Sequence, residues 1–440
     1  MYSLWILSFI MLTSSQKISL LKQAFHAGLS AVMPRNFMTD IVSQLQQTIA
    51  QQPISLIAFG KAAGEMARGY FEAGGRAVRT LVIVPDTVHC EFDHTYAGEV
   101  SIIYSAHPVP NEKSEEAAKA ALSMADSLDQ DDKLVVLISG GGSSLMSLGL
   151  GEVTLKEKQA INQALLDSGM PIQHVNIVRK HLSAVKGGRL ALAAYPASIV
   201  SYAISDVPDD DPSAIASGPT YGDESTREMA AALLANAGIE VSDKVKQLLA
   251  DARSESPFKD DARLQKSDFH IVASAPIALQ AAARPLRDAG YDVVICEDSF
   301  QLDTVTLADV MQEKLAVLPM GTALISGGEA SVAVKGSGIG GRNAQFALEM
   351  TRRQLPDICG ISCDTDGIDG AKQTAGAVFY DGLVQQAIEQ NIAIDAYYAN
   401  FDSHTFFEKL GCDIVTGPTE TNVNDLRILL KGSPVTPSCK

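Results

Sequence analysis

Residues 134–144 read Leu-Val-Val-Leu-Ile-Ser-Gly-Gly-Gly-Ser-Ser, an apolar run that passes directly into a glycine loop. Such a run is typical of a strand buried on both faces of a parallel sheet. Three glycines let the backbone turn tightly and direct N–H groups toward an anion, and the serines add hydroxyl donors. A glycine-rich turn without a ligand is the alternative. We expect the loop to bind phosphate through Ser139, Gly140, Gly141, Gly142, Ser143 and Ser144.

The order of strand, glycine turn and helix recurs outward from this loop. Residues 54–59 form an apolar run before Gly60 and Lys61, and residues 115–128 carry alanines at helical spacing. Apolar strands separated by helical segments predict an α/β fold whose first part is a parallel sheet with helices on both faces.

A charged, serine-containing stretch over residues 251–267 is the expected domain boundary. The α/β pattern restarts after it, and beyond Gly321 the strands become short and are punctuated by glycines, which indicates a mixed sheet. We therefore expect a Rossmann-like N-terminal domain over residues 17–255 and a second α/β domain over residues 265–432. We expect the site to lie in the cleft between them.

Composition excludes several classes of protein. The 440 residues are 46% hydrophobic and 20% charged, which is typical of globular proteins, and the formal net charge is −17. An acidic surface repels nucleic-acid phosphates and anionic lipids, so we expect neither partner. A small anionic ligand stays compatible with that charge, because a few placed cations can override the average. The sequence leaves the oligomeric state open, with a homodimer among the options.

The start of the chain and the cysteines bear on location. Residues 2–12 form an apolar run that is too short to span a bilayer and lacks the basic region and cleavage site of a signal peptide. We expect residues 1–16 to be a non-structural leader or a mis-assigned start, with secretion as the less favoured alternative. The six cysteines are scattered and predict reduced thiols in the cytoplasm.

Cations gather at two places in this acidic chain. Lys61 follows a strand end and begins a helix, where a lysine can reach a phosphate, although an exposed lysine is an equal alternative. Residues 176–189 hold four cations and a histidine in 14 positions, which predicts a patch for a carboxylate or phosphate. A solvated helix face is the alternative there. The candidate substrate-binding residues of this segment are Asn176, Arg179, Lys180 and Lys186.

Carboxylates and an arginine complete the candidate set. Asp206 and Asp209 lie in a proline-containing loop after a strand, where hard oxygen ligands suit Mg²⁺ bound to phosphates, or form an ordinary acidic loop. Arg342 follows a glycine loop, and a mobile arginine there could neutralise a migrating phosphoryl group. Asp366 lies in a carboxylate-rich turn that could contact a metal or a substrate hydroxyl.

The second half repeats the first loop. Residues 325–331 read Ile-Ser-Gly-Gly-Glu-Ala-Ser, so Ser-Gly-Gly again follows a predicted buried strand. Gly327, Gly328 and Glu329 are therefore a second candidate cofactor-binding loop.

Nine segments, in order over residues 17–431, resemble the type-II glycerate kinases, the glycerate 2-kinase family whose carboxyl-terminal part is called the MOFRL domain. The segments are AFGKAAGEM (58–66), HPVP (107–110), LISGGGSSL (137–145), AISDVP (203–208), SGPT (217–220), ISGGE (325–329), GGRN (340–343), TDGIDG (365–370) and TGPTETNVNDL (416–426). Residues 1–16, 89–94 and those after 431 depart from the family pattern and leave the glycine loops untouched.

The resemblance implies ATP- and Mg²⁺-dependent phosphorylation of D-glycerate. It marks Lys61 and Arg342 as active-site residues, with Asp206 as a third catalytic candidate. We expect the nucleotide phosphates on residues 139–144, with 327–329 as a second candidate. The glycerate carboxylate is expected at Arg179, Lys180 or Lys186. The base that orients the attacking hydroxyl is Asp206 or Asp366, and the sequence does not choose between them.

Two other functions compete with the kinase. Members of the family have been labelled hydroxypyruvate reductases, but no GxGxxG segment stands between a strand and a helix to bind NAD(P)H. The other alternative is a non-catalytic module that binds a nucleotide or a sugar acid.

Overall fold

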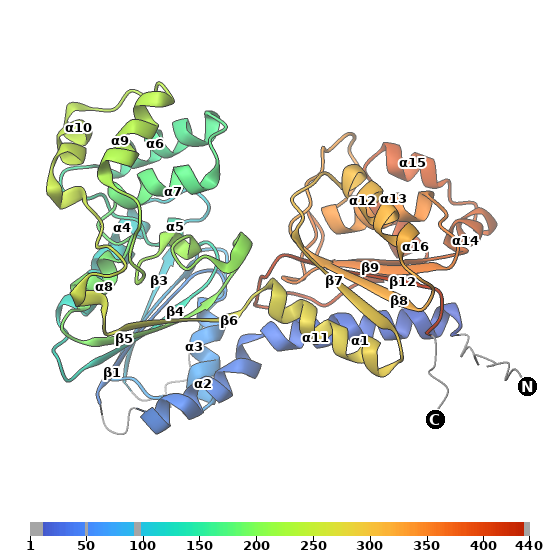
Figure 1. Ribbon diagram of the computed structural model, residues 1–440, viewed down its shortest axis with the longest axis horizontal. Coiled ribbons are helices and arrows are strands. Elements are labelled where there is room, and N and C mark those ends of the chain that lie inside the picture. Colours follow the sequence, from blue (N-terminus) through green and yellow to red (C-terminus); the bar gives the residue numbers. More distant parts are fainter. Residues whose placement is uncertain (1–11, 49–51, 92–97, 435–440) are drawn as a thin grey trace, which may run out of the picture. The chain divides into compact units, whose positions relative to one another are not determined.

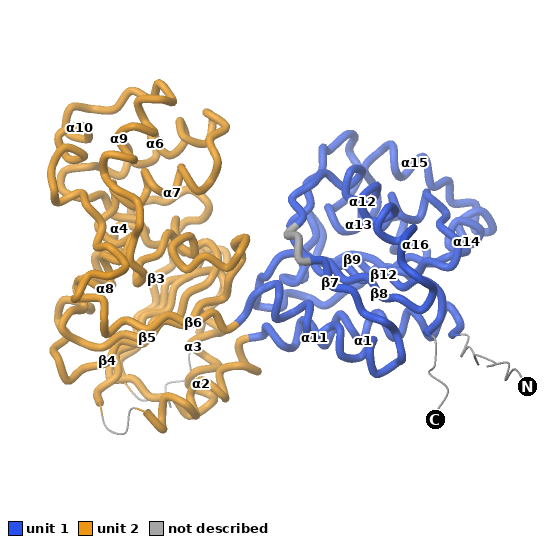
Figure 2. The backbone as a smooth tube through the Cα atoms, viewed as in Figure 1, with its two compact units in different colours: residues 1–33, 273–440 blue, residues 34–272 orange. Residues whose placement is uncertain are grey.

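The computed structural model describes residues 12–48, 52–91 and 98–434, which form two compact units (Figures 1 and 2). Unit 1 comprises residues 1–33 and 273–440, and unit 2 comprises residues 34–272. Each unit is built on its own six-stranded sheet. The prediction of an α/β fold with two sheets is confirmed.

The sheet of unit 2 is formed by the apolar strands that the sequence indicates. Neighbouring strands pair in parallel from β3 through β5, and β6 lies beside β5 at the edge. In β4 every residue after the first is buried, as a strand covered on both faces requires. In spatial order the strands are β3 (Glu99–Ser105), β2 (Arg79–Pro85), β1 (Ile54–Phe59), β4 (Lys133–Ile138), β5 (Ser198–Ile204) and β6 (Ser267–Ala273).

Helices cover both faces of this sheet. The side chain of Asn111 caps α4 (Glu112–Asp126), whose small buried face packs with α8 (Arg189–Ala194) on one face of the strands. On the other side lie α2 (Pro34–Thr48) and α3 (Ala63–Glu72) (Figure 1).

A separate helical layer stands above the sheet of unit 2 and has its own apolar core (Figure 1). The short helix α5 (Gly142–Leu145) follows β4 directly. The layer consists of α6 (Leu155–Asp167), α7 (Ile172–His181), α9 (Arg227–Asn236) and α10 (Asp243–Ala250).

The sheet of unit 1 is mixed, as the glycine-punctuated strands predict. Strand β7 is parallel to β8, whereas β12 is antiparallel to both β8 and β9, and β10 is antiparallel to β9 and β11. In spatial order the strands are β11 (Asp413–Ile414), β10 (Gly376–Tyr380), β9 (Ile358–Asp364), β12 (Asp425–Lys431), β8 (Thr322–Gly327) and β7 (Asp292–Ser299).

Helices also sandwich the sheet of unit 1 (Figure 1). The chain's first helix, α1 (Ser14–Val32), lies beside α11 (Ala275–Asp288) on one face. The other helices are α12 (Thr304–Val317), α13 (Arg342–Arg352), α14 (Leu383–Glu389), α15 (Ile394–Ala399) and α16 (Ser403–Lys409).

The units differ from the expected domains of residues 17–255 and 265–432 at both ends of the first domain. Helix α1 belongs to unit 1, where Gly28 packs so closely that an added Cβ would lie 2.9 Å from the carbonyl oxygen of Ala278. Residues 269–273, expected to open the second domain, form β6 of the first sheet. Local pattern predicts a helix or strand but not the sheet on which it packs.

The described residues contain no helix that is long and apolar enough to cross a membrane. Five cysteines are described, and all are buried and free of disulfides. Most of the expected leader, residues 1–11, lies outside the described residues, and the cytoplasmic location stays a prediction.

Candidate functional site

The glycine loop after β4 is held by the start of α3. The backbone N–H of Ala62 donates to Ser139 Oγ at 3.0 Å, and that of Lys61 donates to the carbonyl oxygen of Gly140 at 2.9 Å. Gly141 has a φ of 83°, and a Cβ there would lie 2.9 Å from the ring of His107. The left-handed conformation and this close approach both require glycine.

Two candidate catalytic residues flank this loop. A Cβ built on Gly140 would lie 2.2 Å from Oδ2 of Asp206, so this carboxylate lies directly against the loop. The side chain of Lys61 also lies close to the loop, because its Cγ would lie 3.3 Å from a Cβ built on Gly141. Burial, and then the charge of Lys61, lower the pKa of His107, which favours a neutral imidazole beside the loop.

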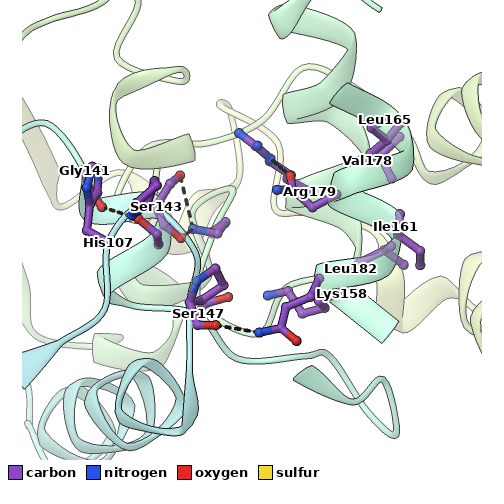
Figure 3. A pocket seen from close by; sticks show the side chains of 16 residues that line it. His107, Gly141, Ser143, Ser147, Lys158, Ile161, Leu165, Val178, Arg179 and Leu182 are labelled. Carbon is purple, nitrogen blue, oxygen red and sulfur yellow. Dashed lines mark hydrogen bonds between the residues drawn. The ribbon is translucent and has the colours of Figure 1, made fainter. Parts of the chain in front are cut away.

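A cavity of about 200 Å³ opens beside the loop within unit 2 (Figure 3). Helix α6 contributes Ile161 and Leu165, and α7 contributes Val178, so one wall is apolar. Gly141 and Ser143 line the facing side. The cavity therefore joins the predicted anion-binding loop to a partly apolar pocket.

Three cations line this cavity and bind neutral partners. Lys186 Nζ donates to the carbonyl oxygen and Oγ of Ser143, at 2.6 and 3.2 Å. Arg179 donates through Nε to Oδ1 of Asn162 at 2.5 Å, and Lys158 Nζ donates to a backbone carbonyl.

Burial sets the protonation of these cations. Burial lowers the pKa of Lys186 well below its usual range, and charge repulsion from Lys158 and Arg179 lowers it further. Burial also lowers the pKa of Arg179 and brings that of Lys158 to about 8.

The other residues predicted to bind substrate are divided. Asn176 accepts from Arg179 and from Ser217, at 3.4 and 3.5 Å, and so adjoins the site. Lys180 does not line the cavity: its ammonium lies 3.0 Å from Asp223 Oδ1, and both side chains are buried. Successive residues of a helix point in different directions, which a charge cluster in the sequence does not reveal.

Arg342 in unit 1 is held by carboxylates, unlike the mobile arginine that the sequence predicted. Its Nε donates to Asp425 Oδ1 at 2.8 Å, NH1 donates to Glu329 at 2.9 Å, and NH2 donates to Asp364 Oδ2 at 2.5 Å. Burial alone would lower the pKa of Arg342, but Asp425 and Asp364 outweigh it and raise that pKa.

The second Ser-Gly-Gly loop is bound by its own unit. The buried guanidinium of Arg427 donates to the carbonyl oxygens of Gly327 and Gly328, at 2.6 and 3.2 Å. Glu329 pairs with Arg342. Asp366 accepts the backbone N–H of Ile368 at 2.8 Å, in the turn after β9.

The metal candidates are sparse. Asp209 is exposed and has a φ of 60°, and Asp206 lies against Gly140. Within residues 12–48, 52–91 and 98–434 no three His, Cys, Asp or Glu side chains gather to hold a metal ion. One or two carboxylates with substrate phosphates are a common Mg²⁺ site, so Asp206 beside the glycine loop fits that ion.

Sequence reasoning missed several residues of these sites. Lys158 shares a helix face with Ile161 and Leu165, and a lysine on an apolar face was a readable signal. His107 was noted only within a family motif. No local signal marked Asp425 as a partner of Arg342, 83 residues away.

The structure is that of a two-unit α/β protein with a glycine loop beside a cavity lined by cations. A family model described as "Domain of unknown function (DUF4147)" matches residues 20–250, and the MOFRL family model matches residues 322–425. The first of these regions lies largely in unit 2, and the second lies entirely in unit 1.

Named relatives cover nearly the whole chain. The D-glycerate 2-kinase of Thermotoga maritima is 36% identical over 91% of this chain and 95% of its own. An Agrobacterium vitis protein named "Putative hydroxypyruvate reductase" is 37% identical over 94% of both chains. The human protein named glycerate kinase is 31% identical over 93% of this chain and 92% of its own.

Solved structures agree with the sequence relatives. The crystal structure of Thermotoga maritima glycerate kinase matches with a TM-score of 0.82 at 34% identity, over 95% of this chain and 99% of that one. A Pyrococcus horikoshii structure matches with a TM-score of 0.81 at 27% identity, over 96% and 100%. The chain belongs to the glycerate kinase family that carries the MOFRL domain.

Proposed function

We propose that this protein is a glycerate 2-kinase, which transfers the γ-phosphoryl group of ATP to D-glycerate and releases 2-phosphoglycerate and ADP. The observation that carries the proposal is the glycine loop of residues 139–144, which opens on a cavity lined by three cations. Backbone N–H groups and fixed cations are what phosphoryl transfer requires, because its catalysis is positioning and charge stabilisation. The names of the kinase relatives indicate glycerate as the substrate.

Several of the predicted residues have a role in this proposal. Arg179 and Lys186 bind the glycerate carboxylate, and residues 139–144 bind the nucleotide phosphates. Lys61 neutralises charge on the transferring group, and Arg342, whose charge is balanced by three carboxylates, orients that group through its remaining N–H donors. The buried carboxylates around Arg342 support its role by fixing the guanidinium in one orientation.

Mg²⁺ would be held by Asp206 and Asp209 together with phosphate oxygens. When bound, the ion would neutralise charge on those oxygens. Asp206 supports this assignment because it lies against the glycine loop.

The reaction makes one bond and breaks another. The 2-hydroxyl oxygen of glycerate bonds to the γ-phosphorus while the bond from that phosphorus to the bridging oxygen breaks, and ADP leaves with the electron pair. The hydroxyl proton goes to a carboxylate, for which Asp206 and Asp366 are the candidates.

Two measurements test the proposal. ADP release should require D-glycerate, and phosphorus NMR of the product should show 2-phosphoglycerate. A 3-phosphoglycerate signal would contradict the regiochemistry, and ADP release independent of glycerate would contradict the substrate.

The alternatives predict other outcomes. A hydroxypyruvate reductase, the name of the Agrobacterium vitis relative, would oxidise NADH with hydroxypyruvate. A binding module would show no turnover at all. For a kinase, Arg342→Ala should lower kcat/KM about 100-fold, roughly 2.7 kcal/mol of transition-state stabilisation.

A further inference from the structure

The cavity of unit 2 holds more positive charge than the glycerate carboxylate can neutralise. Lys158, Arg179 and Lys186 line it, and each hydrogen-bonds only neutral oxygens among the contacts described above. In the part of the chain that the structure describes, no Asp or Glu lines the cavity. Glycerate carries a single negative charge, and the carboxylate of Glu115 on α4 acts on Lys158 from outside the cavity lining. When all three cations are protonated, at least one of them therefore keeps no counter-charge after glycerate binds.

Another lysine of the same unit shows the usual solution. The buried ammonium of Lys180 lies 3.0 Å from a carboxylate oxygen of Asp223, so its charge is balanced inside the protein. Burying cations without such partners costs free energy. A protein bears that cost where a ligand supplies the missing negative charge.

Size restricts the ligand. A cavity of about 200 Å³ is smaller than the roughly 300–1,000 Å³ that encloses a drug-sized molecule, so it can enclose a small acid or a phosphate group but not a whole nucleotide. A phosphate group carries about −1.5 to −2 charges at pH 7, and a carboxylate adds one more. A small phosphorylated acid therefore matches both the volume and the three cations.

We propose that this cavity binds the phosphorylated acid, the product of the reaction, more tightly than glycerate, and that Lys158 on α6 is the residue that makes this distinction. The inference rests on the proposed function for the identity of the acid. Arg179 and Lys186 suffice for the carboxylate, and Lys158 supplies the charge that only the phosphorylated form can use. The enzyme should accordingly retain its product and be inhibited by it.

Calorimetric titration of the protein without ATP tests this directly, with 2-phosphoglycerate, D-glycerate and inorganic phosphate as probes. The variants are Lys158→Met, Lys158→Arg and, as a matched control, Lys156→Met, which removes an exposed lysine from the same helix. The wild type should bind 2-phosphoglycerate at least about tenfold more tightly than D-glycerate.

Lys158→Met should weaken the binding of 2-phosphoglycerate about tenfold and that of D-glycerate less than threefold, because it removes one charge–charge interaction and keeps the side-chain packing. Lys158→Arg and Lys156→Met should stay near the wild type. Equal loss for both acids would make Lys158 merely structural and overturn the proposal, as would equal wild-type affinities. Inorganic phosphate binding as tightly as 2-phosphoglycerate would show a bare phosphate site and also overturn it.

Proton uptake gives a second readout. Burial lowers the pKa of Lys158 to about 8, with Glu115 on α4 opposing and Arg179 on α7 adding to the shift, and His107 and Lys186 face the same cavity. An anion raises that pKa, so binding at pH 8.5 should take up protons that Lys158→Met does not take up. These titrations do not depend on turnover. If ADP release did not require glycerate, the proposed function would be contradicted. If the wild type bound 2-phosphoglycerate and D-glycerate equally well, only this inference would be contradicted.

Discussion

The two Ser-Gly-Gly loops of this protein follow buried strands in the same way but have opposite surroundings. The loop of residues 139–141 adjoins a cavity lined by cations that bind neutral oxygens. The loop of residues 326–328 is bound by Arg427, and the nearby Arg342 is held by three carboxylates. The cations beside the first loop have no carboxylate among their hydrogen-bond partners described above, while the arginine beside the second loop is paired with carboxylates of its own unit. The comparison teaches that the same motif can have opposite charges packed around it, which the motif alone does not reveal.

The largest effect should come from Asp425 in the balanced loop. Asp425→Ala removes one acceptor from each of Arg342, Arg427 and Asn343, and breaking a buried ion pair costs about 3–5 kcal/mol. Chemical denaturation should show this fall in the free energy of unfolding. Asp395→Ala, which removes an exposed partner of Arg352, should cost less than about 1 kcal/mol. Equal effects would mean that the charges of the second loop are not the structural element described here.

Alanine at equivalent glycines separates the loops by activity. A Cβ at Gly140 would lie 2.2 Å from Asp206, whereas one at Gly327 would lie 3.4 Å from Leu279, an ordinary contact. Gly140→Ala should lower kcat/KM about 100-fold, because an ångström of misplacement is enough for such a loss. Gly327→Ala should change it less than about threefold. A large loss from Gly327→Ala would show that the second loop also binds ligand.

Methionine at two lysines of unit 2 compares an unbalanced charge with a balanced one. Lys186→Met should raise the KM for D-glycerate about tenfold without lowering the free energy of unfolding, because its buried charge lacks a carboxylate partner. Lys180→Met should lower that free energy by about 3 kcal/mol, since it strands the buried carboxylate of Asp223. A destabilised Lys186→Met would contradict the charge imbalance.

The smallest effects should be opposite pH slopes. Burial, and then Asp425 and Asp366, raise the pKa of Asp364 to about 8, so the folded state holds a proton that the unfolded state releases near pH 4. Stability of unit 1 should therefore fall as pH rises from 4 to 8. For Lys158, whose pKa is lowered to about 8, the unfolded state holds the extra proton, and stability of unit 2 should rise between pH 8 and 10.

Melting temperatures across pH measure these slopes. Asp364→Asn should flatten the fall below pH 8, and Lys158→Met should flatten the rise above it, each by at most about 1.4 kcal/mol per pH unit. If neither variant changed the slope of stability in its own pH range, the contrast between the two regions would be contradicted.

The sequence by itself determined what depends on neighbours along the chain. Apolar runs predicted β1 and β4, the triple glycine predicted the turn after β4, and nine ordered segments indicated the family. These features work because strand burial and glycine conformations are local properties of the backbone.

Only the tertiary structure decided which distant residues meet. It assigned α1 to unit 1 and β6 to the first sheet, turned Lys180 toward Asp223, and brought Lys158 into the cavity. It also surrounded Arg342 with carboxylates up to 83 residues away. The physical reason is that charge balance is set by distance in space, and burial makes each uncompensated charge costly wherever its partner lies in the sequence.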